Sequence, residues 1–146
     1  MRERVSKHRL ERGDLFHTVE EPIDLGRALS TLPPETGVAV VDCLTVWLGN
    51  LYYRLEGRED RIREKIESFL GQLDRVPQDV IFVTNEVGWG IVPENTVSRS
   101  FRDMAGYLNR SVAERSTHVY LVCAGIPLAL KGGPAPLPFS PSGRGA

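Results

Sequence analysis

Val38-Ala39-Val40-Val41-Asp42-Cys43 is an apolar run that ends on an aspartate and a cysteine. Two further runs have the same character, one from Val80 to Thr84 and one from Val119 to Cys123. Short runs of β-branched and other apolar residues, without polar alternation, are typical of strands that are covered on both faces. We therefore predict three buried strands.

Helical patterns separate these runs. Apolar residues recur at helical spacing in segments 44–55, 60–76 and 96–115. Gly57 follows the first segment and Pro77 the second, and both residue types end helices. Strands that alternate with helices of this length predict βαβ units, and hence an α/β fold with a mostly parallel sheet.

Composition and charge narrow the class of protein. The 146 residues suffice for one domain, and 41% of them are hydrophobic. Lys and Arg number 18 against 19 Asp and Glu, so no basic excess is available for nucleic acid, and we expect no nucleic-acid partner. No segment approaches the roughly 18 consecutive apolar residues of a membrane span, and the charged N-terminal segment does not resemble a signal peptide. We expect a soluble, cytoplasmic protein.

The cysteines and the C-terminal residues complete this outline. Cys43 and Cys123 lie in apolar runs, so we expect them to be reduced and buried. Residues 132–146 are rich in proline and glycine and poor in apolar side chains. We expect them to form a disordered tail, which leaves residues 1–131 as the folded domain.

Polar residues follow the predicted strands. Asp42 ends the first strand, Asn85 and Glu86 follow the second, and Gly125 follows the third. Ligands of open parallel sheets bind beyond the carboxyl ends of the strands, so we expect these residues to converge on one edge. Asp42 in this position is either an acid that holds Mg²⁺ or a structural, helix-capping residue.

The segment after the second strand has features of an anion site. Gly88 and Gly90 allow the backbone to approach a ligand, and the helix that begins near Thr96 offers free amide groups. Arg99 and Arg102 lie in its first two turns, where cations are unfavourable unless an anion is near.

Two alternatives remain open in this segment. The arginines either bind phosphate or pair with Glu94, Asp103 or solvent. Trp89 either stacks on a ring of a ligand or plugs the loop.

His8 is a candidate nucleophile. It lies between two cations, in Lys7-His8-Arg9. A neutral imidazole attacks phosphorus well, and neighbouring positive charge keeps it deprotonated and attracts a triphosphate. The alternative is an ordinary surface histidine, which is our interpretation of His17 and His118.

The residues from Val83 to Asn95 resemble the signature of a known family, the bifunctional adenosylcobinamide kinase/adenosylcobinamide-phosphate guanylyltransferases. The resemblance continues C-terminally and also appears in other segments of the chain. It covers residues 1 to about 131, and the further matching positions are Arg99, Phe101-Arg102-Asp103, Ala105-Gly106, Asn109, Val41 to Thr45, Arg4-Val5, His8-Arg9, Val19 to Pro22 and Gly125 to Pro127.

The resemblance implies an enzyme of cobalamin biosynthesis. Family members phosphorylate a hydroxyl group of adenosylcobinamide with a nucleoside triphosphate, ATP or GTP. They then transfer GMP from GTP to the product through a covalent GMP-histidine, with Mg²⁺ as cofactor. His8 matches that histidine, and Asp42 matches the acid on the Mg²⁺ side.

The resemblance also implies the fold, the nucleotide contacts and the assembly. The fold is a RecA-like P-loop α/β domain, and the assembly is a homotrimer with the nucleotide site near a subunit interface. The residues expected near the nucleotide are Asn85, Glu86, Gly88, Gly90, Arg99 and Arg102.

The sequence departs from the family pattern at its beginning. Family members carry a strand, a glycine-rich loop with lysine and serine, a helix and a second strand before the histidine segment, whereas the 146 residues contain no G-x-x-x-x-G-K-S/T motif. A smaller departure is Arg110, where glutamine is common.

Two explanations compete for the absent segment. The chain is either a mis-started or truncated product whose true start lies upstream, or a genuinely short chain that has lost kinase activity. The alternative to an enzyme is a non-catalytic, nucleotide-binding or oligomerising remnant of the same fold. A sheet that lacks an inner strand has open edges, so we predict that the chain as given is marginally stable or aggregates.

Overall fold

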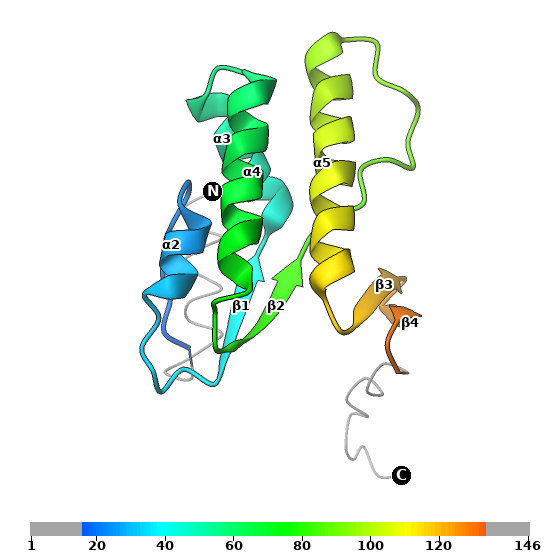
Figure 1. Cartoon of the computed structure of the whole chain (residues 1–146). Coiled ribbons are helices and arrows are strands. Elements are labelled where there is room, and N and C mark those ends of the chain that lie inside the picture. The colour runs from blue at the N-terminus through cyan, green and yellow to red at the C-terminus, as the bar shows by residue number, and fades with distance from the viewer. Residues whose placement is uncertain (1–15, 134–146) are drawn as a thin grey trace, which may run out of the picture.

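The computed structural model describes residues 16–133 and shows a mixed α/β arrangement (Figure 1). Strands β1 (Val38–Asp42) and β2 (Asp79–Val83) form a parallel pair. Strands β3 (Val119–Cys123) and β4 (Ile126–Lys131) form an antiparallel hairpin. The helices are α2 (Leu25–Ser30), α3 (Leu44–Arg54), α4 (Glu59–Leu73) and α5 (Thr96–Arg115). His8 and its neighbours lie outside the described residues, as do residues 134–146 of the predicted tail 132–146.

The predicted α/β class and its main elements are confirmed. The three apolar runs form β1, β2 and β3, and the three helical patterns form α3, α4 and α5. Two elements were not predicted, the short helix α2 and the strand β4. Helix α4 ends at Leu73, before Pro77, while Gly57 lies just after α3 with a φ of 70°.

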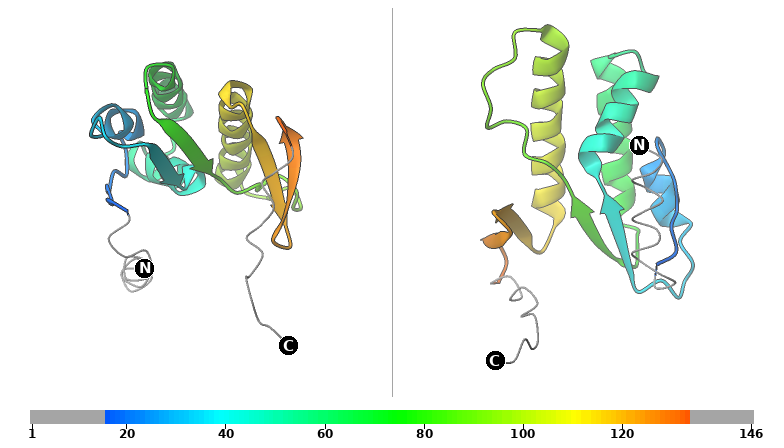
Figure 2. Two further views of the ribbon diagram at one scale, coloured as in Figure 1. Left: turned by 90° about the horizontal axis from the view of Figure 1, so that it is seen from below. Right: turned by 180° about the vertical axis from the view of Figure 1, so that it is seen from behind.

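The sheet differs from the predicted one. We expected one mostly parallel sheet, but within residues 16–133 only β1 and β2 pair in parallel, and β3 pairs with β4 instead. The ends of β1 and β2 are neighbours, whereas the end of β3 belongs to the separate hairpin (Figure 2). Alternating strands and helices predict which elements form, but they do not specify which strand edges meet.

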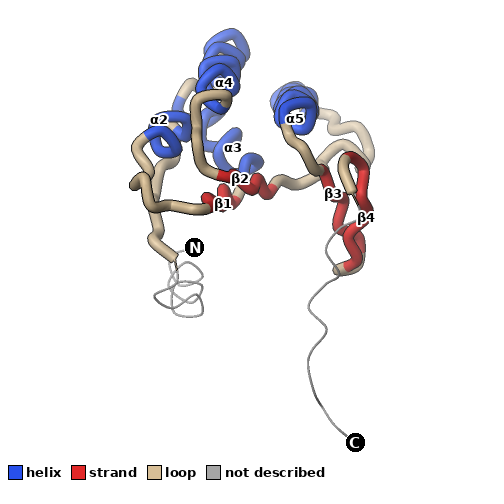
Figure 3. Tube along the Cα trace, turned by 60° about the horizontal axis from the view of Figure 1, so that its bottom comes forward, coloured by secondary structure: helices blue, strands red, loops and turns tan. Residues whose placement is uncertain are grey.

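The hydrophobic core lies among the helices and one face of the β1–β2 pair (Figure 3). The largest fully buried side chains come from α3, α4 and α5, and they are Leu44, Leu48, Leu51, Ile62, Ile66 and Leu108. Burying one such side chain contributes about 1.5–3 kcal/mol to folding. Ala39 and Val41 of β1, with Val80 and Phe82 of β2, pack against this core.

Aromatic side chains connect the elements of the core. The ring of Trp47 lies 4.9 Å from that of Phe69, and its indole N–H donates a 2.9 Å hydrogen bond to the carbonyl oxygen of Ile23. On the other side of α3, the ring of Tyr52 meets Phe101 edge to face, and its hydroxyl lies 2.7 Å from Ser100 Oγ. Burial raises the pKa of Tyr52. These contacts attach α3 to both α4 and α5.

The second face of the β1–β2 pair is open, which corrects the prediction of strands covered on both faces. Val38 and Val40 are each 48% exposed, and Ile81 and Val83 are 54% and 42% exposed. No element among residues 16–133 covers this face, because the helices lie on the other side of the two strands (Figure 3). A run of apolar residues indicates that both faces of a strand are suited to burial, but it does not show that another helix or strand covers each face.

The hairpin β3–β4 is attached to the C-terminal end of α5. The ammonium group of Lys131 donates hydrogen bonds to the carbonyl oxygens of Ala113 and Glu114, at 3.0 and 2.9 Å. A cation in this position satisfies carbonyl groups that the helix leaves without partners.

The predicted burial of both cysteines is wrong. Cys43 is half-buried at the start of α3, and Cys123 is exposed at the end of β3. Both thiols are free. Cys123 is exposed because the hairpin lies beside α5 and is not enclosed between layers of helices.

Candidate functional site

The carboxyl ends of β1 and β2 lie side by side, as predicted. The two strands pair in register from Val38 with Asp79 to Asp42 with Val83. The carboxylate of Asp42 therefore lies next to the point where the chain leaves β2 through Thr84 and Asn85. Asp42 is exposed, and α3 begins two residues later, at Leu44. This strand edge is the candidate functional site.

A group of polar side chains holds this edge together. The hydroxyl of Thr45 lies 3.2 Å from that of Thr84 and accepts a 2.9 Å hydrogen bond from the backbone N–H of Asn85. Asn109 of α5 accepts a 2.7 Å hydrogen bond from the Thr84 hydroxyl, and its amide donates to the carbonyl oxygen of Asn85 at 3.3 Å. The start of α3, the end of β2 and the middle of α5 are thus connected directly.

The loop after Asn85 folds back on itself at Glu86. One carboxylate oxygen of Glu86 accepts a 2.8 Å hydrogen bond from the backbone N–H of Gly88. A Cβ atom at Gly88 would lie 2.8 Å from the same oxygen, so glycine permits this close approach. At Gly90, by contrast, a Cβ atom would meet nothing within 4 Å. The local structure therefore explains why glycine stands at position 88, whereas it gives no such explanation for Gly90.

Trp89 does not plug the loop. Its side chain is 77% exposed, and Ile91 beside it is 97% exposed. Of the two interpretations that the sequence left open, the structure excludes the plug. An exposed indole beside exposed aliphatic groups is a surface on which an apolar or aromatic ligand can lie.

Arg99 fastens the end of the loop to the start of α5. Its guanidinium group donates to the carbonyl oxygens of Pro93 (3.0 Å) and Glu94, and to the hydroxyl of Thr96 at 3.2 Å. Asn95 caps the helix, since its side chain accepts a 2.7 Å hydrogen bond from the N–H of Ser98. Arg99 thus binds the backbone of Glu94 rather than its carboxylate.

Arg102 has an acidic neighbour. Its Nε atom lies 3.6 Å from a carboxylate oxygen of Asp103. Arg102 therefore forms the ion pair with Asp103 that the sequence allowed as an alternative to phosphate binding.

The two arginines lie far from the strand edge. Asn109 contacts the edge, and Arg99 precedes it by ten positions on the same helix. At 1.5 Å per residue, this separation is about 15 Å along the axis. The loop after β2 runs along α5 to its far end (Figures 1 and 2). The structure therefore brings Asp42 and Asn85 together, while Arg99 and Arg102 lie at the other end of this loop.

His8 and Gly125 complete the set of sequence-predicted residues. His8 lies outside the described residues. Gly125 lies in the turn of the β3–β4 hairpin with a φ of 77°, so its role in the structure is to form this turn. The sequence indicated Thr45 and Asn109 only as positions that match the family. Each of the two polar residues directly follows a buried leucine, Thr45 after Leu44 and Asn109 after Leu108, and this pattern is the signal that could have singled them out.

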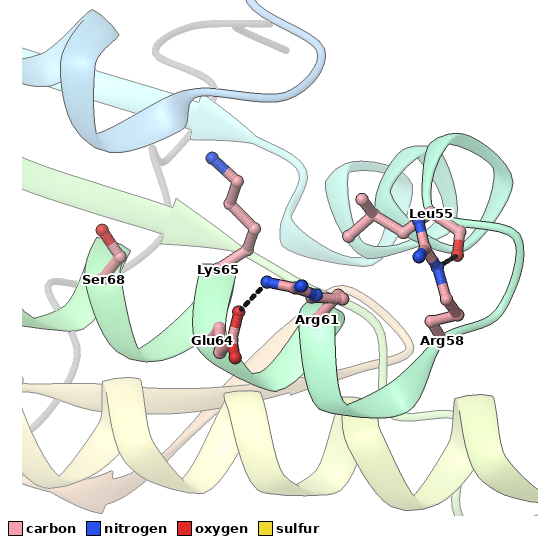
Figure 4. A pocket seen from close by; sticks show the side chains of 6 residues that line it. All are labelled: Leu55, Arg58, Arg61, Glu64, Lys65 and Ser68. Atoms are coloured by element: carbon pink, nitrogen blue, oxygen red, sulfur yellow. Dashed lines mark hydrogen bonds and ion pairs between the residues drawn. The ribbon is translucent and has the colours of Figure 1, made fainter.

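A separate cavity of about 480 Å³ lies along α4 and is lined by Leu55, Arg58, Arg61, Glu64, Lys65 and Ser68 (Figure 4). Arg61 forms a 3.1 Å ion pair with Glu64, and Arg58 donates to the carbonyl oxygen of Leu55 at 3.3 Å. None of the described site candidates lines it. Both arginines of this cavity thus already have partners within its lining, and the cavity lies apart from the strand edge.

A comparison with known families identifies the family of the chain. The family described as cobinamide kinase/cobinamide phosphate guanyltransferase matches residues 1–130, and the chain belongs to this family. Within residues 16–133, no helix combines the length and apolar character that crossing a membrane requires.

Individual relatives agree with this assignment. The bifunctional adenosylcobalamin biosynthesis protein CobP of Pseudomonas aeruginosa is 39% identical over 139 residues, which is 92% of this chain and 76% of the relative. The protein of the same description from Escherichia coli K12, CobU, is 33% identical over 142 residues, or 90% and 78% of the two chains. CobU of Salmonella typhimurium is 36% identical over 111 residues, or 68% and 61%.

Proposed function

We propose that this chain acts in cobalamin biosynthesis, on adenosylcobinamide and its phosphate, with GTP and ATP as nucleotide substrates. The observation that carries the proposal is the family match over residues 1–130. Support comes from relatives that are 33–39% identical and are described as bifunctional adenosylcobalamin biosynthesis proteins. The reactions are phosphorylation of adenosylcobinamide and transfer of GMP to the resulting phosphate.

His8 is the proposed nucleophile for GMP transfer. A nitrogen of its neutral imidazole attacks the α-phosphorus of GTP, the bond to the bridging oxygen breaks, and pyrophosphate leaves. A phosphate oxygen of adenosylcobinamide phosphate then attacks the phosphorus of GMP-histidine, and the N–P bond breaks to restore the imidazole. Lys7 and Arg9 support this role, because positive charge keeps the imidazole deprotonated.

Asp42 is the proposed protein ligand of Mg²⁺. The carboxylate is exposed and lies at the end of β1, next to the exit of β2. Mg²⁺ at nucleotide sites is commonly bound by one or two carboxylates together with phosphate oxygens and water, so an exposed acid at this edge fits the ion. When bound, Mg²⁺ supplies charge neutralisation for the departing pyrophosphate.

The proposed nucleotide-binding residues lie along the loop from the strand edge to α5. Asn85, Glu86, Gly88 and Gly90 are exposed, so a nucleotide can reach them. Arg99 and Arg102 lie at the far end of this loop, where half-buried guanidinium groups favour a phosphate. The bonds from Arg99 to the loop backbone support a further task, which is to hold the loop in its binding shape.

The test is the intact mass of the full chain before and after incubation with GTP and Mg²⁺. We expect a gain of one GMP per chain, which acid removes and base does not, as for an N–P bond. His8→Asn is expected to abolish the gain, and His17→Asn is the matched control that retains it. An adduct that persists in His8→Asn would contradict the assignment of the nucleophile.

The same experiment addresses the second candidate function. GTP binding by calorimetry without any adduct in the unmodified chain would favour a non-catalytic, nucleotide-binding protein. The 146 residues contain no G-x-x-x-x-G-K-S/T motif, so the phosphorylation of adenosylcobinamide is to be assayed separately from GMP transfer.

A further inference from the structure

The polar group at the strand edge is a closed ring of four hydrogen bonds. The Thr84 hydroxyl donates its only proton to Asn109 Oδ1, so the hydroxyl of Thr45 is the donor in the contact between the two threonines. Asn109 Nδ2 donates to the carbonyl oxygen of Asn85, and the N–H of Asn85 donates back to Thr45. Each of the four residues therefore donates one bond and accepts one.

The ring has a definite direction, which constrains its members. Asn109 uses its oxygen toward Thr84 and its amide group toward Asn85, so a side chain with only one of these functions cannot replace it. Hydrogen bonds that follow one another in this way polarise and strengthen each other. The ring consequently favours a single position of the Asn85 peptide.

The ring connects three elements at the point where the loop begins. Thr45 lies at the start of α3, three positions after Asp42, and Asn109 lies on α5. Asn85 is the last ring member before Glu86 and the exposed loop. The ring therefore sets the direction in which the loop leaves the strand edge beside Asp42.

We propose that Asn109 is a positioning residue, which acts through Thr84 and the Asn85 backbone to hold the Asn85-Glu86 peptide against the Asp42 edge. This inference rests on the proposed function, since the site that it organises is the proposed nucleotide site. Asn109 itself touches no reacting atom in this scheme. The core does not depend on it, because Thr84 and Asn85 are exposed and Thr45 and Asn109 are half-buried.

The variants separate positioning from general stability. Asn109→Leu removes both ring functions with a side chain of the same branched shape, and Asn109→Asp removes only the donor to Asn85. Thr45→Val removes the hydroxyl, whereas Thr45→Ser retains it. The matched control is Ser100→Ala, which breaks another hydrogen bond between α3 and α5, the one to Tyr52, away from the ring.

GMP transfer is measured for the full chain of each variant as kcat and KM for GTP. Asn109→Leu, Asn109→Asp and Thr45→Val are expected to lower kcat by about tenfold with a smaller change in KM, because the geometry loosens while other nucleotide contacts remain. Thr45→Ser and Ser100→Ala are expected to keep the original kcat. Cooperative thermal unfolding of each variant confirms that it is folded.

A spectroscopic measurement observes the ring independently of activity. The backbone amide of Asn85 loses its acceptor in Thr45→Val, so the temperature coefficient of its proton shift is expected to change to that of a solvent-exposed amide. Asn109→Leu leaves the acceptor of this amide in place and breaks two other bonds of the ring, so the same change in that variant is expected only if the ring acts as a unit. An Asn85 amide that does not respond to Asn109→Leu would overturn the inference.

The two proposals fail in distinguishable ways. An active chain whose kcat is the same in all ring variants overturns the positioning role and leaves the proposed function intact. A chain that forms no GMP adduct overturns both. A loss of activity in Ser100→Ala equal to that in Asn109→Leu would also count against the inference, because it would reflect general helix packing.

Discussion

Glu21 is the residue whose electrostatics the structure defines most directly. Its carboxylate accepts hydrogen bonds from the backbone N–H groups of Asp24 and Ile23, both at 2.8 Å. These bonds, the one from Asp24 foremost, lower the pKa of Glu21 below its usual value of 4.5. Helix α2 begins directly afterwards, with Asp24 as its N-cap. Glu21 thus orders the approach to this helix.

The lowered pKa predicts the pH dependence of Glu21→Gln. The stabilisation by Glu21 is fully present above pH 4.5, and it disappears as the pH falls through the lower pKa of the folded state. We therefore expect Glu21→Gln to be less stable than the parent at pH 7, with the difference shrinking as the pH falls below 4.5. Thermal unfolding between pH 3 and 7 measures this. Glu67→Gln on the exposed side of α4 is the control, and a constant difference across the range would contradict the assignment.

The positions of individual site residues could be predicted from the sequence where the pairing of neighbouring strands determines them. Asp42 and Asn85 end adjacent parallel strands, so the apolar runs before them were enough to bring them together. The partners of Arg99 were not predictable, because they are carbonyl oxygens of the preceding loop, and every residue carries one. The hydrogen-bonded ring through Asn109 could not be predicted for the same reason, since Asn85 takes part in it through its backbone N–H and carbonyl groups.

At the scale of the elements, the β3–β4 hairpin shows how turn chemistry decides a structure. Ala124 and Gly125 connect the strands with φ values of 51° and 77°. Positive φ at both central residues is typical of a type I′ turn, whose twist matches that of the strands. Glycine adopts this conformation readily, whereas alanine is strained in it.

This turn predicts opposite effects for one substitution at two positions. Ala124→Gly is expected to stabilise the chain by about 1 kcal/mol, because it relieves the positive φ. Ala113→Gly in α5 is the control and is expected to destabilise it by about 1 kcal/mol or more, from lower helix propensity. Urea unfolding of both variants gives the two free energies. A loss of stability in Ala124→Gly would show that the turn is not strained.

Helices and strands differed in how far the sequence predicted them. The apolar stripes of α3, α4 and α5 face the core, so the helical period was visible. Strand β4 was missed because Pro127 lies within it, and proline argues against a strand unless its position needs no N–H. Helix α2 spans only six residues, too few for a period to appear.

At the scale of the whole molecule, the described residues have a covered side and an open side. The helices bury one face of β1 and β2, and the other face carries the exposed cross-strand pair Val40 and Ile81. Apolar surface of this kind favours association between molecules. The earlier expectation of marginal stability or aggregation therefore stays a prediction, with a defined surface to test.

A pair of charges on this surface tests that expectation. The double variant Val40→Lys with Ile81→Glu places opposite charges directly across the strands, where they attract each other. We expect it to aggregate at higher concentrations than the parent, as measured by light scattering, with little change in thermal unfolding. Val41→Lys on the covered face is the contrast and is expected to unfold the chain. Unchanged aggregation in the double variant would mean that this face is not responsible.

The two tryptophans lie in opposite environments, and this gives the chain a pair of built-in optical reporters. Trp47 is buried, with its indole N–H bonded and its ring against Phe69, so its fluorescence follows the packing of the helices. Trp89 stands in solvent on the loop, where a dissolved quencher reaches it and a ligand shields it. Emission from one chain thus separates disruption of the interior from occupation of the loop, without any attached label.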